Sequence, residues 1–158
     1  MTTTRQRSRR GQAFAEFALI LPILIALTGG AMDFARIYQA SITLQTATRN
    51  AAEYAATVAS SQSQAQTDAR RVVCTETRNI PGFTPGLGGS VPNCTDPSVT
   101  VTAFSVSATA PGANASYPLA IATVRSQIGF RTLIPWPWLP DASWAIGSTQ
   151  TYSVIQNR

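Results

Sequence analysis

One uncharged apolar stretch near the N-terminus constrains this chain more than any other feature. Residues 17–32 carry no charged side chain, and counting back across Glu16 to Gln12 extends the stretch to twenty-one residues. At about 1.5 Å per residue, a helix of this length covers roughly 30 Å, which is the thickness of the hydrocarbon core of a bilayer. We therefore predict a transmembrane helix at residues 12–33.

The basic residues around this stretch predict its orientation. An arginine cluster precedes it, and the positive-inside rule keeps such a cluster in the cytoplasm. Everything after Asp33 then faces outward. We expect a single-pass protein of the cytoplasmic (inner) membrane, with its N-terminus inside and its C-terminus outside, in contact with the lipid bilayer. The residues expected to hold the N-terminus inside are Arg5, Arg7, Arg9 and Arg10.

Composition argues against nucleic-acid binding and against catalysis. The formal net charge is +5, but without the four clustered arginines it is about +1, which leaves no basic face for phosphates. The chain has no His and no Lys, so the commonest general base and metal ligand are missing. Its seven acidic residues form no short-spaced pair. We expect no enzyme activity, no cofactor, no metal and no small-molecule substrate.

The two cysteines, Cys74 and Cys94, both follow the apolar stretch. Two Cys without His cannot complete a typical four-ligand zinc site. An even pair on the outward side favours one disulfide, and two buried free thiols are the alternative. The nineteen residues between them include seven Gly or Pro, which is typical of a loop.

Glu16 distinguishes three explanations of the apolar stretch. A secretory signal, with a cut among the small residues 29–31, does not need a carboxylate there, and neither does a plain anchor. A carboxylate costs about 2.5–3.5 kcal/mol at the centre of a membrane helix, and less near the interface. A type IV prepilin-like signal does explain it. A cut after Gly11 makes Gln12 the first residue and Glu16 the fifth.

The new α-amine of such a cut protein is mostly protonated at neutral pH. Its charge is opposite to that of Glu16, and each would be costly to bury alone. Within an assembly, the amine of one subunit can pair with Glu16 of a neighbour. Pairing one turn apart in the same helix is an alternative. Pairing between subunits would also set their axial register, which is a hypothesis.

Two stretches carry a resemblance to a known family. The run RRGQAFAEFALILP at residues 9–22 and the run MDFARIY at residues 32–38 resemble TadE-like proteins, with Ala35 where glycine is common. These are pseudopilins, or minor pilins, of the tight-adherence (Flp/Tad) pilus system. The resemblance is strong over residues 9–59 and elsewhere extends only to the layout.

The resemblance implies cleavage by a prepilin peptidase between Gly11 and Gln12, and a function in building an adhesion pilus. It also implies partners, namely other pilins or pseudopilins and an inner-membrane pilus assembly platform. After assembly, such a subunit can lie in an extracellular pilus.

Apolar periodicity continues past the membrane stretch and predicts an amphipathic extension of the helix at residues 34–62. Residues 60–64 read as a polar linker that ends it, and residues 67–73 as a short second helix. The apolar stripe recurs at three- and four-residue steps, widened by further positions: Phe34, Ile37, Tyr38, Ser41, Ile42, Leu44, Thr48, Ala51, Ala52, Ala55, Val58 and Ala59. The alanine-rich end should pack flat against a sheet.

Three strands follow, at residues 99–108, 117–130 and 144–154, and a change of parity after residue 103 predicts a bulge or a break in the first. An antiparallel three-stranded sheet laid on the helix is the simplest arrangement, so the fold class is α+β. We divide the chain into a leader (1–11), a transmembrane helix (12–33), its extension (34–62) and an outward head (63–158).

Four further residues are candidate interface positions. Trp136 and Trp138 lie in the apolar stretch 134–140, where they either cover the edge of the small core or contact a partner or the membrane interface. Asp33 and Arg36 can pair across one helical turn.

Two functions compete on this evidence. A pseudopilin explains the arginine cluster, Gly11, Glu16, the long helix and the cysteine pair together. A secreted or membrane-anchored β-rich binding domain leaves Glu16 unexplained.

The mass of the N-terminal peptide of the mature protein separates these explanations. A mature chain that starts at Gln12 is expected for a pseudopilin. A start near Met32 would instead indicate a secretory signal, and retention of Met1 or Thr2 a simple anchor.

Overall fold

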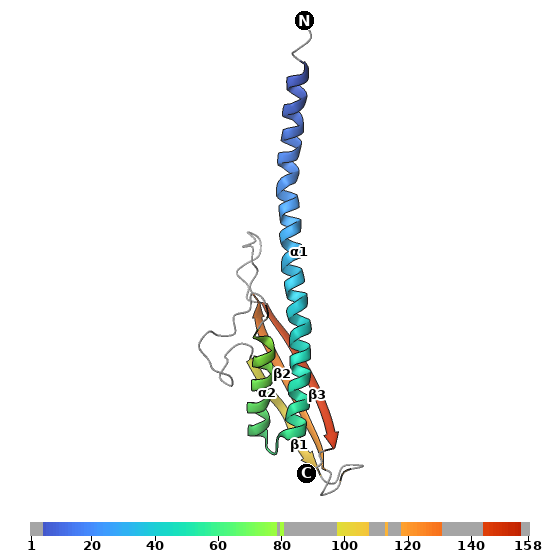
Figure 1. Cartoon of the computed structure of the whole chain (residues 1–158), viewed down its shortest axis with the longest axis vertical. Helices are drawn as coiled ribbons and strands as arrows, with labels where there is room; N and C mark the ends of the chain where they lie inside the picture. The colour runs from blue at the N-terminus through green and yellow to red at the C-terminus, as the bar shows by residue number, and fades with distance from the viewer. Residues whose placement is uncertain are drawn as a thin grey trace. The chain divides into compact units, whose positions relative to one another are not determined.

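The computed structural model confirms the predicted α+β class. It describes residues 5–78, 80, 98–107, 113, 118–130 and 144–155. Two helices precede three strands in the chain (Figure 1). The elements are α1 (Arg5–Val58), α2 (Gln62–Thr77), β1 (Ser98–Ser107), β2 (Leu119–Phe130) and β3 (Trp144–Ile155).

The chain divides into two compact units, Met1–Ala35 and Arg36–Arg158. The first unit contains the N-terminal part of α1, which begins at Arg5 rather than at Gln12. The second unit, called the head below, contains the rest of α1, α2 and the sheet.

The predicted linker at residues 60–64 is too long, because α2 begins already at Gln62 and runs for 16 residues. Ser61 is the N-cap, and its hydroxyl accepts a hydrogen bond from the backbone N–H of Gln64. The Gln64 carboxamide in turn accepts from the backbone N–H of Ser60 at 3.2 Å. The sequence Ser61-Gln62-Ser63-Gln64 resembles a capping box, so polar residues that look like a linker begin a helix.

The sheet has the order β1-β2-β3, and both pairings are antiparallel. The β2–β3 register is continuous from the Leu119–Ile155 pair to the Phe130–Trp144 pair. The β1–β2 register shifts between Val101 and Ala103, which confirms the irregularity predicted in the first strand.

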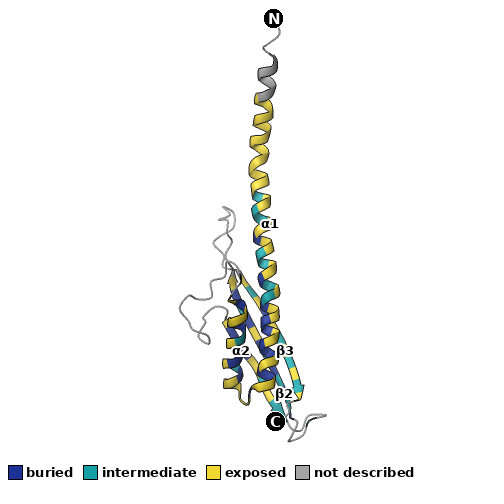
Figure 2. Cartoon of the chain, viewed as in Figure 1, coloured by how far each residue is buried: buried dark blue, intermediate teal, exposed yellow. Residues whose placement is uncertain are grey.

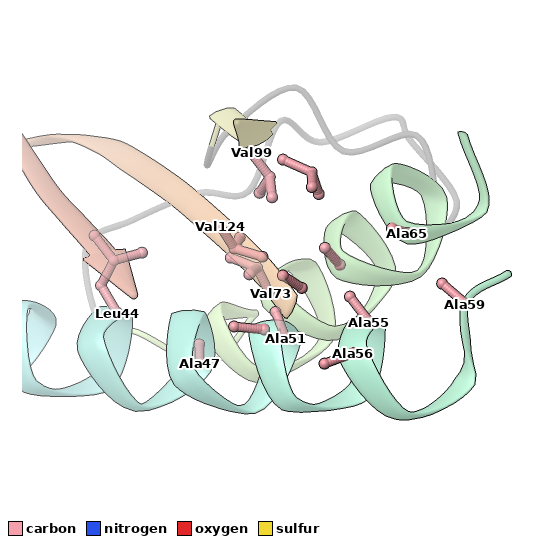
Figure 3. Packing of buried hydrophobic residues seen from close by; sticks show 14 of the residues in the cluster. Leu44, Ala47, Ala51, Ala55, Ala56, Ala59, Ala65, Val73, Val99 and Val124 are labelled. Atoms are coloured by element: carbon pink, nitrogen blue, oxygen red, sulfur yellow. The ribbon is translucent and has the colours of Figure 1, made fainter. Parts of the chain in front are cut away.

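Small side chains form most of the helical contribution to the core of the head. Alanines along α1 and α2 pack with valines of α2, β1 and β2, as Figure 3 shows, and this confirms the predicted packing of the alanine-rich end. The fully buried alanines of the two helices and of the turn between them are Ala40, Ala47, Ala51, Ala52, Ala55, Ala56, Ala59, Ala65 and Ala69.

Several larger members of the predicted stripe are exposed instead. Tyr38, Ile42 and Val58 are 62%, 47% and 49% exposed, and in the N-terminal unit Phe34 is 70% exposed. Leu44, Thr48 and the alanines of the stripe are buried as predicted. In the head, the helix surface that meets α2 and the sheet is the one with the smallest side chains, because methyl groups permit close backbone approach.

One polar contact crosses this core. The Thr48 hydroxyl donates to the Leu44 carbonyl at 2.6 Å and accepts from the Ser126 hydroxyl on β2. Thr48 and Ser126 are both fully buried. Because a buried hydroxyl without a partner is costly, this contact favours one register of α1 against β2.

A side chain from α2 covers the outer edge of β1. The Gln66 carboxamide donates to the Val99 carbonyl at 2.8 Å and accepts from the Val101 N–H at 2.6 Å. The two bonds imitate those of a neighbouring strand. Edge strands present backbone groups that invite pairing with another chain, so Gln66 blocks this edge.

Replacing Gln66 with Met keeps the length of the side chain and removes both bonds. We expect the Val101 amide to lose protection in hydrogen exchange, measured on the full chain in detergent micelles. The head should lose about 1–3 kcal/mol of stability, because the Val101 N–H is left without a partner. Gln45→Met, at an exposed position of α1, is the matched control and should change neither quantity.

Candidate functional site

The N-terminal part of α1 presents apolar side chains on all sides. Phe14 is 74% exposed and Leu19 is 76% exposed, and the predominance of exposed residues is visible in Figure 2. One described helix is long and apolar enough to cross a membrane. Its most apolar 18-residue window has a mean hydropathy of 1.9 and is 6% buried. Such a helix is compatible with single-pass membrane anchoring.

Glu16 interrupts this apolar surface with a carboxylate. It is exposed, and its Oε1 accepts a hydrogen bond from the Gln12 carboxamide at 3.3 Å. The two residues are four apart, so the helix places them on the same face, one turn from each other. The structure thus places Gln12, the predicted first residue after the cut, next to Glu16, the residue predicted to pair with its amine.

Gly11 immediately precedes this pair. It lies in α1, and apart from the adjacent residues and the helix's own backbone, a Cβ at this position would meet no heavy atom within 4 Å. Glycine inside a helix is less favourable than alanine by about 0.5–1 kcal/mol. Packing among the described residues therefore does not require glycine at this position, and helix stability disfavours it.

The structure describes some of the other predicted site residues but not all of them. Asp33 is buried and Arg36 is half-buried, and whether they form an interface stays a prediction. The four clustered arginines lie in the helical backbone of α1, and their role in orientation also stays a prediction. Trp136 and Trp138 lie outside the described residues.

Cys74 lies on α2 and is 2% exposed. Its predicted partner, Cys94, lies outside the described residues, so the pairing stays a prediction. Among the residues that the structure does describe, no group of three or more His, Cys, Asp or Glu side chains could hold a metal ion.

A small hollow lies on the head between α1 and α2. It has a volume of about 290 Å³ and is lined by Tyr54 on α1 and by residues of α2 that include Arg71 and Glu76. Asn50 donates to both carboxylate oxygens of Glu76, at 2.9 and 3.2 Å. This contact fastens α1 to α2, and the sequence pattern did not reveal it because the two residues are twenty-six positions apart.

Comparison with known protein families gave a match in the N-terminal part of the chain. Residues 11–53 match the model of a family described as TadE-like protein. The match starts at Gly11 and includes Glu16 and the 32–38 run. Neither the curated proteins nor the solved structures gave a match to the chain. The family model bears out the resemblance inferred from the sequence: this chain is similar to TadE-like proteins over residues 11–53, and that family suggests a Tad pilus-associated protein.

Proposed function

We propose that this chain is a pseudopilin, or minor pilin, of a Tad/Flp-type pilus, cut after Gly11 and assembled through its N-terminal helix. The observation that carries the proposal is the Glu16 carboxylate in the otherwise uncharged, largely exposed apolar stretch 12–32 of α1, one turn from the first residue of the cut chain. The TadE-like match, which begins at Gly11, supports the same function.

The exposed helix requires a cover of apolar groups. Its large side chains, such as Phe14 and Leu19, contact no core in the N-terminal unit. In the membrane, lipid provides the cover, and in a filament the helices of neighbouring subunits replace the lipid. This exchange is near neutral for the apolar side chains, because lipid tails are as apolar as leucine. Packing and polar contacts between helices must then favour assembly.

Glu16 is the residue that can supply a polar contact of this kind. In the uncut chain, the neutral Gln12 carboxamide donates a hydrogen bond to only one carboxylate oxygen of Glu16, the Oε1 atom. Cleavage places a positively charged α-amine on residue 12. The amine can pair with Glu16 of an adjacent subunit, and it offsets the cost of burying a carboxylate among helices. A charged pair of this kind forms only when two helices have the correct axial offset.

Gly11 supports the proposed cleavage site. Glycine at position 11 is less favourable for the helix than alanine, and packing among the described residues does not require it. Recognition by a peptidase gives a reason for it, because a residue without a side chain lets the backbone approach an enzyme closely. We assign this cut to a prepilin peptidase acting at the cytoplasmic face, where the arginine cluster is expected to stay.

The remaining partners follow from the same function. The subunit would contact other pilins or pseudopilins and an inner-membrane assembly platform. Its head would face outward, where a disulfide between Cys74 and Cys94 is stable. No described cysteine is a free thiol, which supports this pairing.

Gly11→Ala tests the cleavage site. We expect the variant to remain helical at this position, because the added methyl group meets nothing within 4 Å. It should nevertheless keep its arginine-rich leader, which intact mass measurement of the membrane-extracted protein detects. The matched control is Gly30→Ala, in the same apolar stretch, which should be processed normally. If Gly11→Ala instead loses its leader as efficiently as the parent and the Gly30 variant do, the assigned cut after Gly11 is wrong.

Glu16→Ala tests the charge pairing. Insertion into the membrane should be intact, because the change makes the helix more apolar. Incorporation into pili, or recovery with partner pilins, should fall about tenfold or more, since a buried charge without its partner costs several kcal/mol. Glu53→Ala, which removes an exposed carboxylate of α1 in the head, should assemble like the parent. Normal assembly of the Glu16 variant would refute the pairing.

A further inference from the structure

Both described helices lie on the same face of the sheet, and neither covers its other face. The inward-facing residues of β2, such as Val124 and Ser126, are buried beneath α1 and α2, whereas the alternate residues on β1, β2 and β3 point away from the helices. This second face is called the outer face below. Its exposed members are mostly Ser and Thr: Ser98, Thr100, Thr102, Ser105, Thr149, Thr151 and Ser153.

Arg125 is the one charged residue in the three described strands. It is exposed in the central strand of the outer face, directly opposite Thr100 of β1 and Thr149 of β3. No hydrogen bond or ion pair joins its guanidinium to another described residue. Its positive charge therefore faces solvent, without a carboxylate on the described strands to neutralise it.

A hollow of about 320 Å³ lies at this position, lined by Arg125, Gln127, Ser98, Thr100 and Thr102. Its volume is at the lower end of the range for small-molecule sites. Gly147 pairs with Gln127 from the neighbouring strand and presents no side chain there.

Some hydroxyl groups that line this hollow donate to the backbone of the sheet, and other polar groups there do not. The Ser98 hydroxyl donates to the Gln127 carbonyl at 3.4 Å, and the Thr102 hydroxyl donates to the Thr123 carbonyl at 3.3 Å. Both hydroxyl oxygens remain able to accept. Among the described residues, neither the Thr100 hydroxyl nor the Gln127 carboxamide has a hydrogen-bond partner. The hollow thus offers one cation at Arg125, groups that both donate and accept at Thr100 and Gln127, and acceptors at Ser98 and Thr102.

We propose that this hollow binds an acidic polysaccharide, with a sugar carboxylate on Arg125 and sugar hydroxyls on Thr100, Gln127, Ser98 and Thr102. Arginine matches a carboxylate through two parallel N–H···O bonds. Hydroxyl and carboxamide side chains both donate and accept, as sugar hydroxyls do. Binding of a nucleic acid needs several positively charged side chains to neutralise its phosphates, and the described strands carry one.

The test uses the full chain in nanodiscs of zwitterionic lipid at low salt, with binding measured by microscale thermophoresis. Oligogalacturonate is the probe, and the same oligosaccharide with methyl-esterified carboxylates is the neutral comparison. We expect dissociation constants in the range of about 1 mM for the acidic form, typical of a small open site. The esterified form should bind at least about fivefold more weakly, because it loses the charge-assisted bonds.

Two variants locate the site. Arg125→Gln should weaken oligogalacturonate binding at least about fivefold, whereas Arg49→Gln, which removes an exposed arginine of α1, should leave it unchanged. Thr100→Val preserves the shape and strand preference of the side chain and should weaken binding while the thermal unfolding midpoint stays the same.

Other outcomes would overturn the proposal. Equal loss in the Arg49 variant would indicate attraction to overall charge. Equal binding of polyglutamate or of inorganic phosphate would indicate a general anion site or another class of partner. Absence of binding by oligogalacturonate to the parent protein would exclude the site. None of these results depends on whether the chain is a pilus subunit.

Discussion

Close approach of backbones through alanine methyl groups is the constraint on which the head depends. Alanines of α1 and α2 are fully buried, and the largest fully buried side chains include only one leucine, Leu44. A three-stranded sheet has too little apolar surface to form a stable core alone, so it needs the helices close to it. Because small side chains bring two helices near one face of the sheet, a few valines on the strands are enough to fill the space between them.

The same constraint explains why polar contacts matter in this head. A thin core gives less hydrophobic stabilisation than a thick one, and it also leaves hydroxyl and carboxamide groups near the backbone of neighbouring elements. Thr48 contacts Ser126, Asn50 contacts Glu76, and Gln66 covers the edge of β1. Each contact joins residues that are far apart in sequence. Together they favour one placement of α1 and α2 over the sheet and restrict pairing of β1 with other chains.

The N-terminal unit is stabilised in a different way from the head. Its apolar side chains are exposed, and its stability as a helix comes from backbone hydrogen bonds within the segment, which is what a lipid environment demands. Glu16 is the exception in this stretch, and in the uncut chain its partner in the helix is a neutral side chain. The proposed function rests on this difference between the units. The head has a buried core of its own, whereas the large apolar side chains of the N-terminal unit are exposed.

The sequence by itself determined the features that depend on short spacing. These are the apolar stretch, the one-turn separation of Gln12 and Glu16, the strand positions, the parity change in β1 and the TadE-like likeness. Helical and strand periods express such features locally, so they can be read without the fold. Only the tertiary structure decided which members of the predicted stripe of α1 are buried in the head. The stripe contained Tyr38 and Ile42, which are exposed, as well as the alanines, which are buried because they permit close backbone approach. Likewise, the role of Gln66 and the isolation of Arg125 became visible only when distant segments were brought side by side. A residue's partners across a sheet or between helices depend on the packing of the whole head, which local spacing does not specify.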